Sequence, residues 1–143
     1  MNNSPLVEID AQRHQLEIDL VYASADNLAG QVIYRNARCL LHKDAAACLY
    51  KASQLARMAG LGLRIYDAYR PAYAQQLLWQ ALPNPDYVRD PRLGSHHTRG
   101  VAVDLTLVDE TANRWTWAPP SMPWSPSRTS STATCRPRCS AIA

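Results

Sequence analysis

A histidine and an aspartate lie seven residues apart in the second half of the chain, at His97 and Asp104. An imidazole and a carboxylate are usual ligands of a catalytic zinc ion, so the pair is a candidate metal site. On a regular strand an odd offset puts two side chains on opposite faces, so they converge only if the backbone bends between them. Gly100 supplies that conformational freedom. The spacing alone leaves two interpretations open, a shared metal ion or a structural hydrogen bond.

A second candidate is Arg70, which directly precedes a proline in the segment Tyr66-Asp67-Ala68-Tyr69-Arg70-Pro71. This segment joins a predicted strand to a predicted helix, and functional side chains collect at such boundaries. A guanidinium there would stabilise a developing oxyanion or hold a carboxylate between its two nitrogens. In the alternative interpretation, Arg70 pairs with Asp67 and only closes the turn.

The elements that must position these residues follow from hydrophobic periodicity. Alternating apolar residues predict strands over residues 16–20, 61–67 and 101–107, with a further short strand over 31–34. Apolar spacings of three and four predict helices over 43–59 and 71–81, the first ended by a glycine and the second opened by a proline. Strands and helices mix without regular alternation, which favours an α+β fold.

Together the two motifs resemble one family, the zinc D-alanyl-D-alanine dipeptidases of the VanX type. Their relatives are the zinc D,D-carboxypeptidases and the hedgehog-like domains. The family's Tyr-Asp-x-Tyr-Arg-Pro and Ser-x-His-x-x-Gly-x-Ala-x-Asp-Leu-Thr-Leu signatures stand here at residues 66–71 and 95–107. The resemblance covers about residues 6–113 and implies a hedgehog/D,D-peptidase-like α+β fold, in which an antiparallel-rich sheet packs against helices.

The resemblance also implies roles for five residues. His97 and Asp104 would be two of three ligands to one zinc ion per chain, and Arg70 would stabilise the transition state. Asp67 and Ser95 would bind the substrate and help to position both it and the stabilising group of Arg70. The implied substrate is a small D,D-dipeptide, D-alanyl-D-alanine, which is hydrolysed to two molecules of D-alanine.

The sequence departs from the family's pattern after these motifs. The family takes its third zinc ligand, a histidine, and its general base, a glutamate, from a late Glu-x-Trp-His segment. In this sequence no histidine follows His97 and no acidic residue follows Glu110. We therefore expect impaired hydrolysis. Two alternatives stay open, an inactive remnant of the fold and a D,D-carboxypeptidase that acts on cell-wall peptides.

Composition changes near the same point, which predicts a domain over residues 1–113 and a disordered tail over 114–143. The tail is rich in Ser, Thr and Pro and has no helical or strand period. Trp and Met each have a single codon, so part of the nucleotide sequence can be inferred. Reading residues 114–118 in another frame allows Leu-Asp-Met-Gly, which the family has here. We therefore hypothesise a frameshift near residues 111–114.

Charge and hydropathy exclude some partners. The net charge of +3 comes from four arginines after residue 110, and their removal leaves 11 basic against 12 acidic residues in the first 110. No basic stripe suits a nucleic acid, and no apolar run reaches the ~20 residues of a membrane span. The first twenty residues contain acids and no apolar run typical of a secretory signal, so we expect a cytoplasmic protein.

Overall fold

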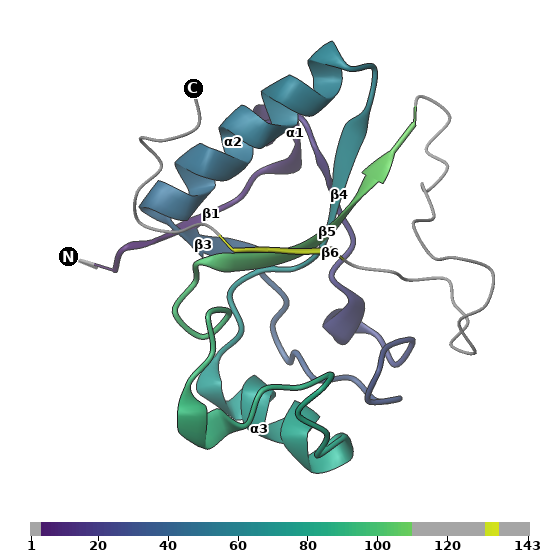
Figure 1. Ribbon diagram of the computed structural model, residues 1–143, viewed down its shortest axis with the longest axis vertical. Helices are drawn as coiled ribbons and strands as arrows, with labels where there is room; N and C mark the ends of the chain where they lie inside the picture. Colours follow the sequence, from purple (N-terminus) through teal and green to yellow (C-terminus); the bar gives the residue numbers. More distant parts are fainter. Residues whose placement is uncertain (1–3, 110–130, 135–143) are drawn as a thin grey trace.

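A computed structural model describes residues 4–109 and 131–134 of the chain (Figure 1). Its helices and strands, with two 3₁₀ turns labelled η, are in chain order β1 (Leu6–Glu8), α1 (Ala11–His14), β2 (Glu17–Ile18), η1 (Val21–Ala23), β3 (Leu40–His42), α2 (Lys43–Met58), β4 (Gly62–Asp67), α3 (Ala72–Ala81), η2 (Pro91–Leu93), β5 (Ala102–Val108) and β6 (Ser131–Thr134).

The strands form two sheets. The larger has the order β2-β4-β5-β6, in which β2 runs parallel to β4 and the other pairs are antiparallel. The smaller is an antiparallel pair of β1 and β3. This arrangement, with helices packed on it, confirms the predicted α+β class with an antiparallel-rich sheet.

Apolar side chains form two clusters on opposite sides of β4, and Figure 1 shows α2 and α3 on these two sides. On one side, Ala46 and Leu49 of α2 pack with Ile65 of β4. On the other, Leu78 of α3 packs in a cluster with Tyr66. Because side chains alternate along a strand, β4 contributes to both clusters and fixes the two helices relative to each other.

The two predicted helices are confirmed to within a residue or two at their ends. The His42 side chain caps α2 by accepting a hydrogen bond from the backbone N–H of Asp44. After α2, Gly60 adopts a φ of +75°, a left-handed conformation that glycine tolerates. Pro71 directly precedes α3, where its missing N–H leaves no helical hydrogen bond unmade. The strand prediction over 61–67 corresponds to β4, and that over 101–107 corresponds to β5.

Other parts of the prediction need correction. Residues 31–34 form no strand, because the backbone N–H groups of Ile33 and Tyr34 both donate to the carbonyl of Tyr22 in a loop. The strand predicted over 16–20 shrinks to β2. The strands β1 and β3 were not predicted, since three residues are too few to show a period.

Within the predicted tail the structure describes residues 131–134, which pair with β5 as β6. The rest of the tail and the hypothesised frameshift lie outside the described residues.

No helix in the described part of the chain is long and apolar enough to span a membrane.

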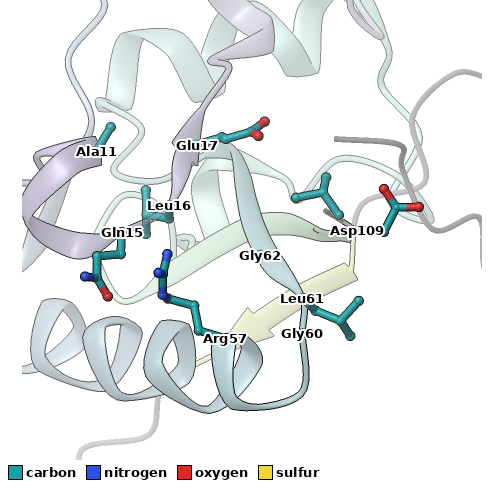
Figure 2. A pocket seen from close by; sticks show the side chains of 10 residues that line it. Ala11, Gln15, Leu16, Glu17, Arg57, Gly60, Leu61, Gly62 and Asp109 are labelled. Carbon is teal, nitrogen blue, oxygen red and sulfur yellow. The ribbon is translucent and has the colours of Figure 1, made fainter. Parts of the chain in front are cut away.

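A hollow of about 410 Å³ opens where β4 begins, lined by residues that include Gln15, Glu17, Arg57 and Asp109 (Figure 2). It contains none of the predicted site residues. Asp67 ends β4, about 17 Å away for a strand of this length.

Candidate metal and catalytic site

A β-bulge at the end of β4 brings two carboxylates to the same face of the sheet. From Gly62 to Ile65 the strand pairs with β5 in regular register, with Ile65 opposite Leu105. The next pair is Asp67 with Asp104, so Tyr66 is one extra residue on β4. Residues directly opposite each other in an antiparallel pair share a face. Without the bulge, Asp67 would point with Ile65 toward α2.

His97 reaches the same face through a tight turn before β5. The carbonyl of His97 accepts hydrogen bonds from the backbone N–H groups of Gly100 and Arg70, both at 3.0 Å. Gly100 has a φ of +72°, and a Cβ there would lie 2.6 Å from Leu6 Cδ2 and 3.2 Å from the backbone nitrogen of His42. The turn therefore requires glycine for its backbone conformation and for the close approach of β1 and β3. This is the bend that the seven-residue spacing predicted.

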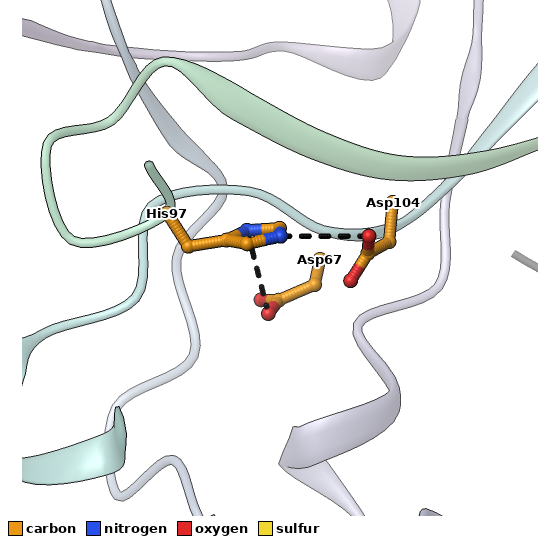
Figure 3. Close-up of side chains that lie close together, drawn as sticks. All are labelled: Asp67, His97 and Asp104. Carbon is orange, nitrogen blue, oxygen red and sulfur yellow. Dashed lines mark ion pairs between the residues drawn. The ribbon is translucent and has the colours of Figure 1, made fainter. Parts of the chain in front are cut away.

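The predicted ligand atoms converge. His97 Nε2 lies 3.4 Å from Asp104 Oδ1. Figure 3 marks this ion pair with a dashed line. Nitrogen and oxygen ligands about 2.0–2.2 Å from a tetrahedral zinc ion are themselves about 3.3–3.6 Å apart, so this spacing fits two ligands of one cation. Asp67, His97 and Asp104 form a cluster in which one candidate ligand atom from each lies within 4.8 Å of the others.

The hydrogen bonds of His97 suit a ligand. Its Nδ1 lies 2.9 Å from the carbonyl oxygen of Ala68, an acceptor, so Nδ1 carries the hydrogen of the neutral ring. A metal ion bound between the two side chains would take the lone pair of Nε2 in this tautomer, as in metal-binding histidines. Without a metal ion, the protonated ring can donate from Nε2 to Asp104. Burial lowers the pKa of His97, but the hydrogen bond and charge of Asp104 raise it, and the net shift is upward.

Arg70 is held beside this pair by a buried clamp. Its Nε and Nη2 both donate to Asp67 Oδ2, at 2.9 and 2.5 Å, and its Nη1 donates to Gln75 Oε1 at 2.8 Å. Nη2 also lies 3.6 Å from Asp104 Oδ2. Burial lowers the pKa of the guanidinium, but the charges of Asp67, Tyr22, Tyr34 and Asp104 together raise it, and the net shift is upward. Arg70 therefore presents a fixed positive charge next to the candidate metal position.

Asp67 is a poor third ligand. Its side chain is 0% exposed, and its Oδ2 already accepts two N–H groups from Arg70. The hydroxyl of Tyr34 donates to its other oxygen, Oδ1. Complete burial raises the pKa of Asp67, and Arg70 and His97 oppose that shift. The described residues therefore fit two of the protein ligands of a zinc ion and leave Asp67 committed to Arg70.

Ser95, the other residue expected to bind substrate, is buried at the start of the turn. Its Oγ accepts a hydrogen bond from the backbone N–H of His97 at 3.2 Å. It thereby stabilises the turn, and its contact with a substrate stays a prediction. The neighbouring His96 is exposed and its Nδ1 contacts Arg99, so it points away from the site.

Three residues of this site were not found from the sequence. Tyr34 binds Asp67, the Tyr22 ring lies under Arg70 with 5.2 Å from Cζ to the ring centroid, and Gln75 binds Nη1. Tyr22 lies in the short η1 turn and Tyr34 in a loop that was predicted to be a strand, and neither segment carries a signal for a site residue. Gln75 had a signal, because it is a polar residue beside Ala74 on the buried face of α3.

Comparison with known proteins supports the same relationship. Residues 2–115 match the family described as D-ala-D-ala dipeptidase, which is most of the chain. The chain belongs to the D-Ala-D-Ala dipeptidase family. All five predicted site residues lie within the segment that matches this dipeptidase family.

Several curated relatives share the match. The D-alanyl-D-alanine dipeptidase of Escherichia coli is 54% identical over 112 residues, which cover 78% of this chain and 58% of that protein. The D-alanyl-D-alanine dipeptidase of Enterococcus faecium is 31% identical over 119 residues, 69% of this chain and 59% of that protein. The enzyme of the same name from Streptomyces coelicolor is 32% identical over 113 residues. The match thus spans somewhat more than half the length of these dipeptidases.

Proposed function

We propose that the described domain carries the ligand pair and the oxyanion-binding arginine of a zinc-dependent hydrolase of D-alanyl-D-alanine. The observation that carries the proposal is the 3.4 Å approach of His97 Nε2 to Asp104 Oδ1, with Arg70 Nη2 beside it. Membership of the D-Ala-D-Ala dipeptidase family supports the choice of substrate. The partner is accordingly a small D,D-dipeptide.

The proposed chemistry divides among few groups. His97 and Asp104 would hold the zinc ion, which when bound lowers the pKa of a water ligand and polarises the peptide carbonyl. Arg70 would bind the oxygen of that carbonyl as negative charge develops on it. Because Asp67 fixes the guanidinium in advance, no reorganisation is needed in the transition state. Asp67 would then act through Arg70, and Ser95 through the turn that carries His97.

A general base and a third zinc ligand are missing from this scheme. No described residue near the site supplies a carboxylate that is not already engaged by Arg70 or His97, and the sequence after Glu110 contains no histidine or acidic residue. We propose that this chain binds zinc weakly and hydrolyses the dipeptide slowly. A two-ligand site lacks both the third donor and the group that accepts a proton from water.

Zinc binding by single variants tests the ligand assignment. We expect His97→Ala and Asp104→Ala to weaken zinc affinity about tenfold or more, since even loss of an outer-shell partner typically has an effect of that size. Competition with a chromophoric chelator measures the affinity. The matched control is His96→Ala, which removes an adjacent exposed histidine. Equal zinc affinity in His97→Ala and His96→Ala would contradict the proposal.

Hydrolysis assays test the substrate and the impairment. Release of D-alanine from D-alanyl-D-alanine is measured for this chain and for a version with the reading frame restored after residue 113. We expect slow release from the first and faster release from the second. Equal rates would overturn the proposed impairment. Release from a longer peptide ending in D-Ala-D-Ala, but not from the dipeptide, would instead favour a carboxypeptidase.

The cytoplasmic location stays a prediction that cell fractionation tests.

A further inference from the structure

We propose that Gln75 is a positioning residue that fixes the orientation of Arg70 and ties it to the main chain at Arg89. The inference rests on the proposed function in one respect, that Arg70 meets the developing oxyanion. The hydrogen bonds that carry it are independent of any metal.

Gln75 is a polar residue in an apolar place. It is 2% exposed and lies between Ala74 and Leu78 on the buried face of α3, where an apolar residue would fit the helix pattern. Burial of an amide is unfavourable unless its polar atoms find partners. Both ends of this amide have one. Oε1 accepts from Arg70 Nη1 at 2.8 Å, and Nε2 donates to the carbonyl of Arg89 at 2.6 Å.

The contact with Arg70 supplies what Asp67 cannot. Asp67 holds the guanidinium through a single oxygen, Oδ2, which accepts from both Nε and Nη2. A planar group held at one point can pivot about that point. Gln75 binds the opposite corner, Nη1, and thereby fixes the direction of the plane over the Tyr22 ring. Asp67 and Gln75 together bind all three nitrogens of the guanidinium, which fixes both its position and its plane.

The contact with Arg89 closes a ring of interactions around the site. The Arg89 Nε donates to the carbonyl of Gly94 at 2.7 Å, and Ser95 follows directly. Ser95 Oγ accepts from the N–H of His97, whose carbonyl in turn accepts from the N–H of Arg70. The orientation of Arg70 and the position of the ligand turn are thus linked through Gln75.

Two variants separate the hydrogen bond of Gln75 to Arg70 from its hydrogen bond to the Arg89 carbonyl. Gln75→Leu keeps the approximate size but removes both hydrogen bonds. Gln75→Glu keeps an acceptor for Arg70 Nη1 and removes the donor to the Arg89 carbonyl. The control is Gln76→Leu, which alters the adjacent exposed glutamine. All are compared as full chains without metal, by ¹⁵N NMR of the arginine side chains and by amide hydrogen exchange.

In Gln75→Leu we expect the Nη1 protons of Arg70 to exchange at least tenfold faster, while its Nε proton stays protected by Asp67. In Gln75→Glu we expect the Nη1 protons to stay protected, and backbone amides of residues 89–97 to exchange faster. Nη1 exchange in Gln75→Leu that equals that of Gln76→Leu would overturn the proposal. Loss of the fold in both Gln75 variants, with Gln76→Leu folded, would also overturn it, since Gln75 would then be merely structural.

A second measurement connects the link to the proposed function. A phosphinate analogue of the D,D-dipeptide, which carries a tetrahedral anion, is titrated by calorimetry into the chain with excess zinc. We expect about tenfold weaker binding of the analogue to Gln75→Leu than to the unchanged chain, with affinity for the dipeptide itself changed less than about twofold. Equal losses for both ligands would overturn a positioning role. Failure of the unchanged chain to bind the analogue would contradict the proposed function, and the exchange experiment would still decide the role of Gln75.

Discussion

Asp67 has the most constrained side chain of the site. It is completely buried and accepts three hydrogen bonds, two from Arg70 and one from Tyr34. Its Oδ2 also lies 3.9 Å from His97 Nδ1, which is a longer and weaker contact. The resemblance implied that Asp67 helps to position both Arg70 and the substrate. Its burial and its hydrogen bonds to Arg70 favour the first role, and contact with a substrate stays a prediction.

The approach of His97 to Asp104 could be predicted from the sequence, because Gly100 indicates a bend between them. The bend brings to one face two side chains that a regular strand would place on opposite faces. The face on which Asp67 lies could not. It depends on the bulge at Tyr66, and nothing in the alternating residues of β4 signals where an extra residue is inserted. Tyr34 was missed for a related reason, since it comes from a loop 33 residues before its partner.

Replacement of Asp67 by asparagine should strongly destabilise the fold. Asp67→Asn leaves the buried Arg70 charge without its counter-ion, and removal of one partner of a buried pair typically has an effect of about 3–5 kcal/mol. Urea denaturation measures the free energy of unfolding. Glu8→Gln is the control, because it breaks an ion pair with Arg38 in which both side chains are about half exposed, and little change is expected. A loss under about 1 kcal/mol for Asp67→Asn, the range of a surface pair, would contradict the buried pairing.

At the scale of elements, the helices were predicted because each is long enough to repeat its apolar pattern. The short strands β1 and β3 were not, since their stability comes from a partner distant in sequence, Leu6 opposite His42. One detail of α2 also differed. Leu55 belongs to the apolar residues spaced by three and four along 43–59, yet it is 60% exposed, and Ser53 is buried instead. Ser53 Oγ donates to the carbonyls of His14 and Gln15, so the end of α1 occupies that side of α2.

The turn between η2 and β5 should depend on Gly100 in two ways. Gly100→Ala must adopt a left-handed conformation, with a penalty of about 1–2 kcal/mol, and its Cβ must also displace Leu6 and the backbone at His42. Gly60→Ala has a similar φ of +75° and no atom within 4 Å of the added Cβ, so it isolates the conformational penalty. We expect Gly100→Ala to lose more unfolding free energy than Gly60→Ala in urea denaturation, and to lose zinc affinity as well. Equal losses in the two variants would show that the close packing around Gly100 is unimportant.

At the scale of the whole molecule, the outer side of α2 leaves apolar surface exposed. Leu55 is 60% exposed and Met58 is 85% exposed, one turn apart on this helix. Exposed apolar patches promote association between molecules.

Charged residues at this patch should therefore keep the protein dispersed. We expect Leu55→Lys together with Met58→Lys to raise the concentration at which light scattering begins. The free energy of unfolding should change by no more than about 0.5 kcal/mol, because surface substitutions seldom exceed that. Unchanged scattering, or destabilisation well beyond that value, would mean that the two side chains are packed rather than exposed.

The extra residue in β4 also bears on attempts to graft this constellation onto another scaffold. A designer who copied the residue types and their separations along the chain onto two evenly paired strands would place Asp67 and Asp104 back to back across the sheet. The arginine would lose its anchor and the imidazole would face a single acid. A working copy of the site therefore needs one more residue in the first strand than in the second between the paired positions. This difference is visible only when the two strands are aligned with each other.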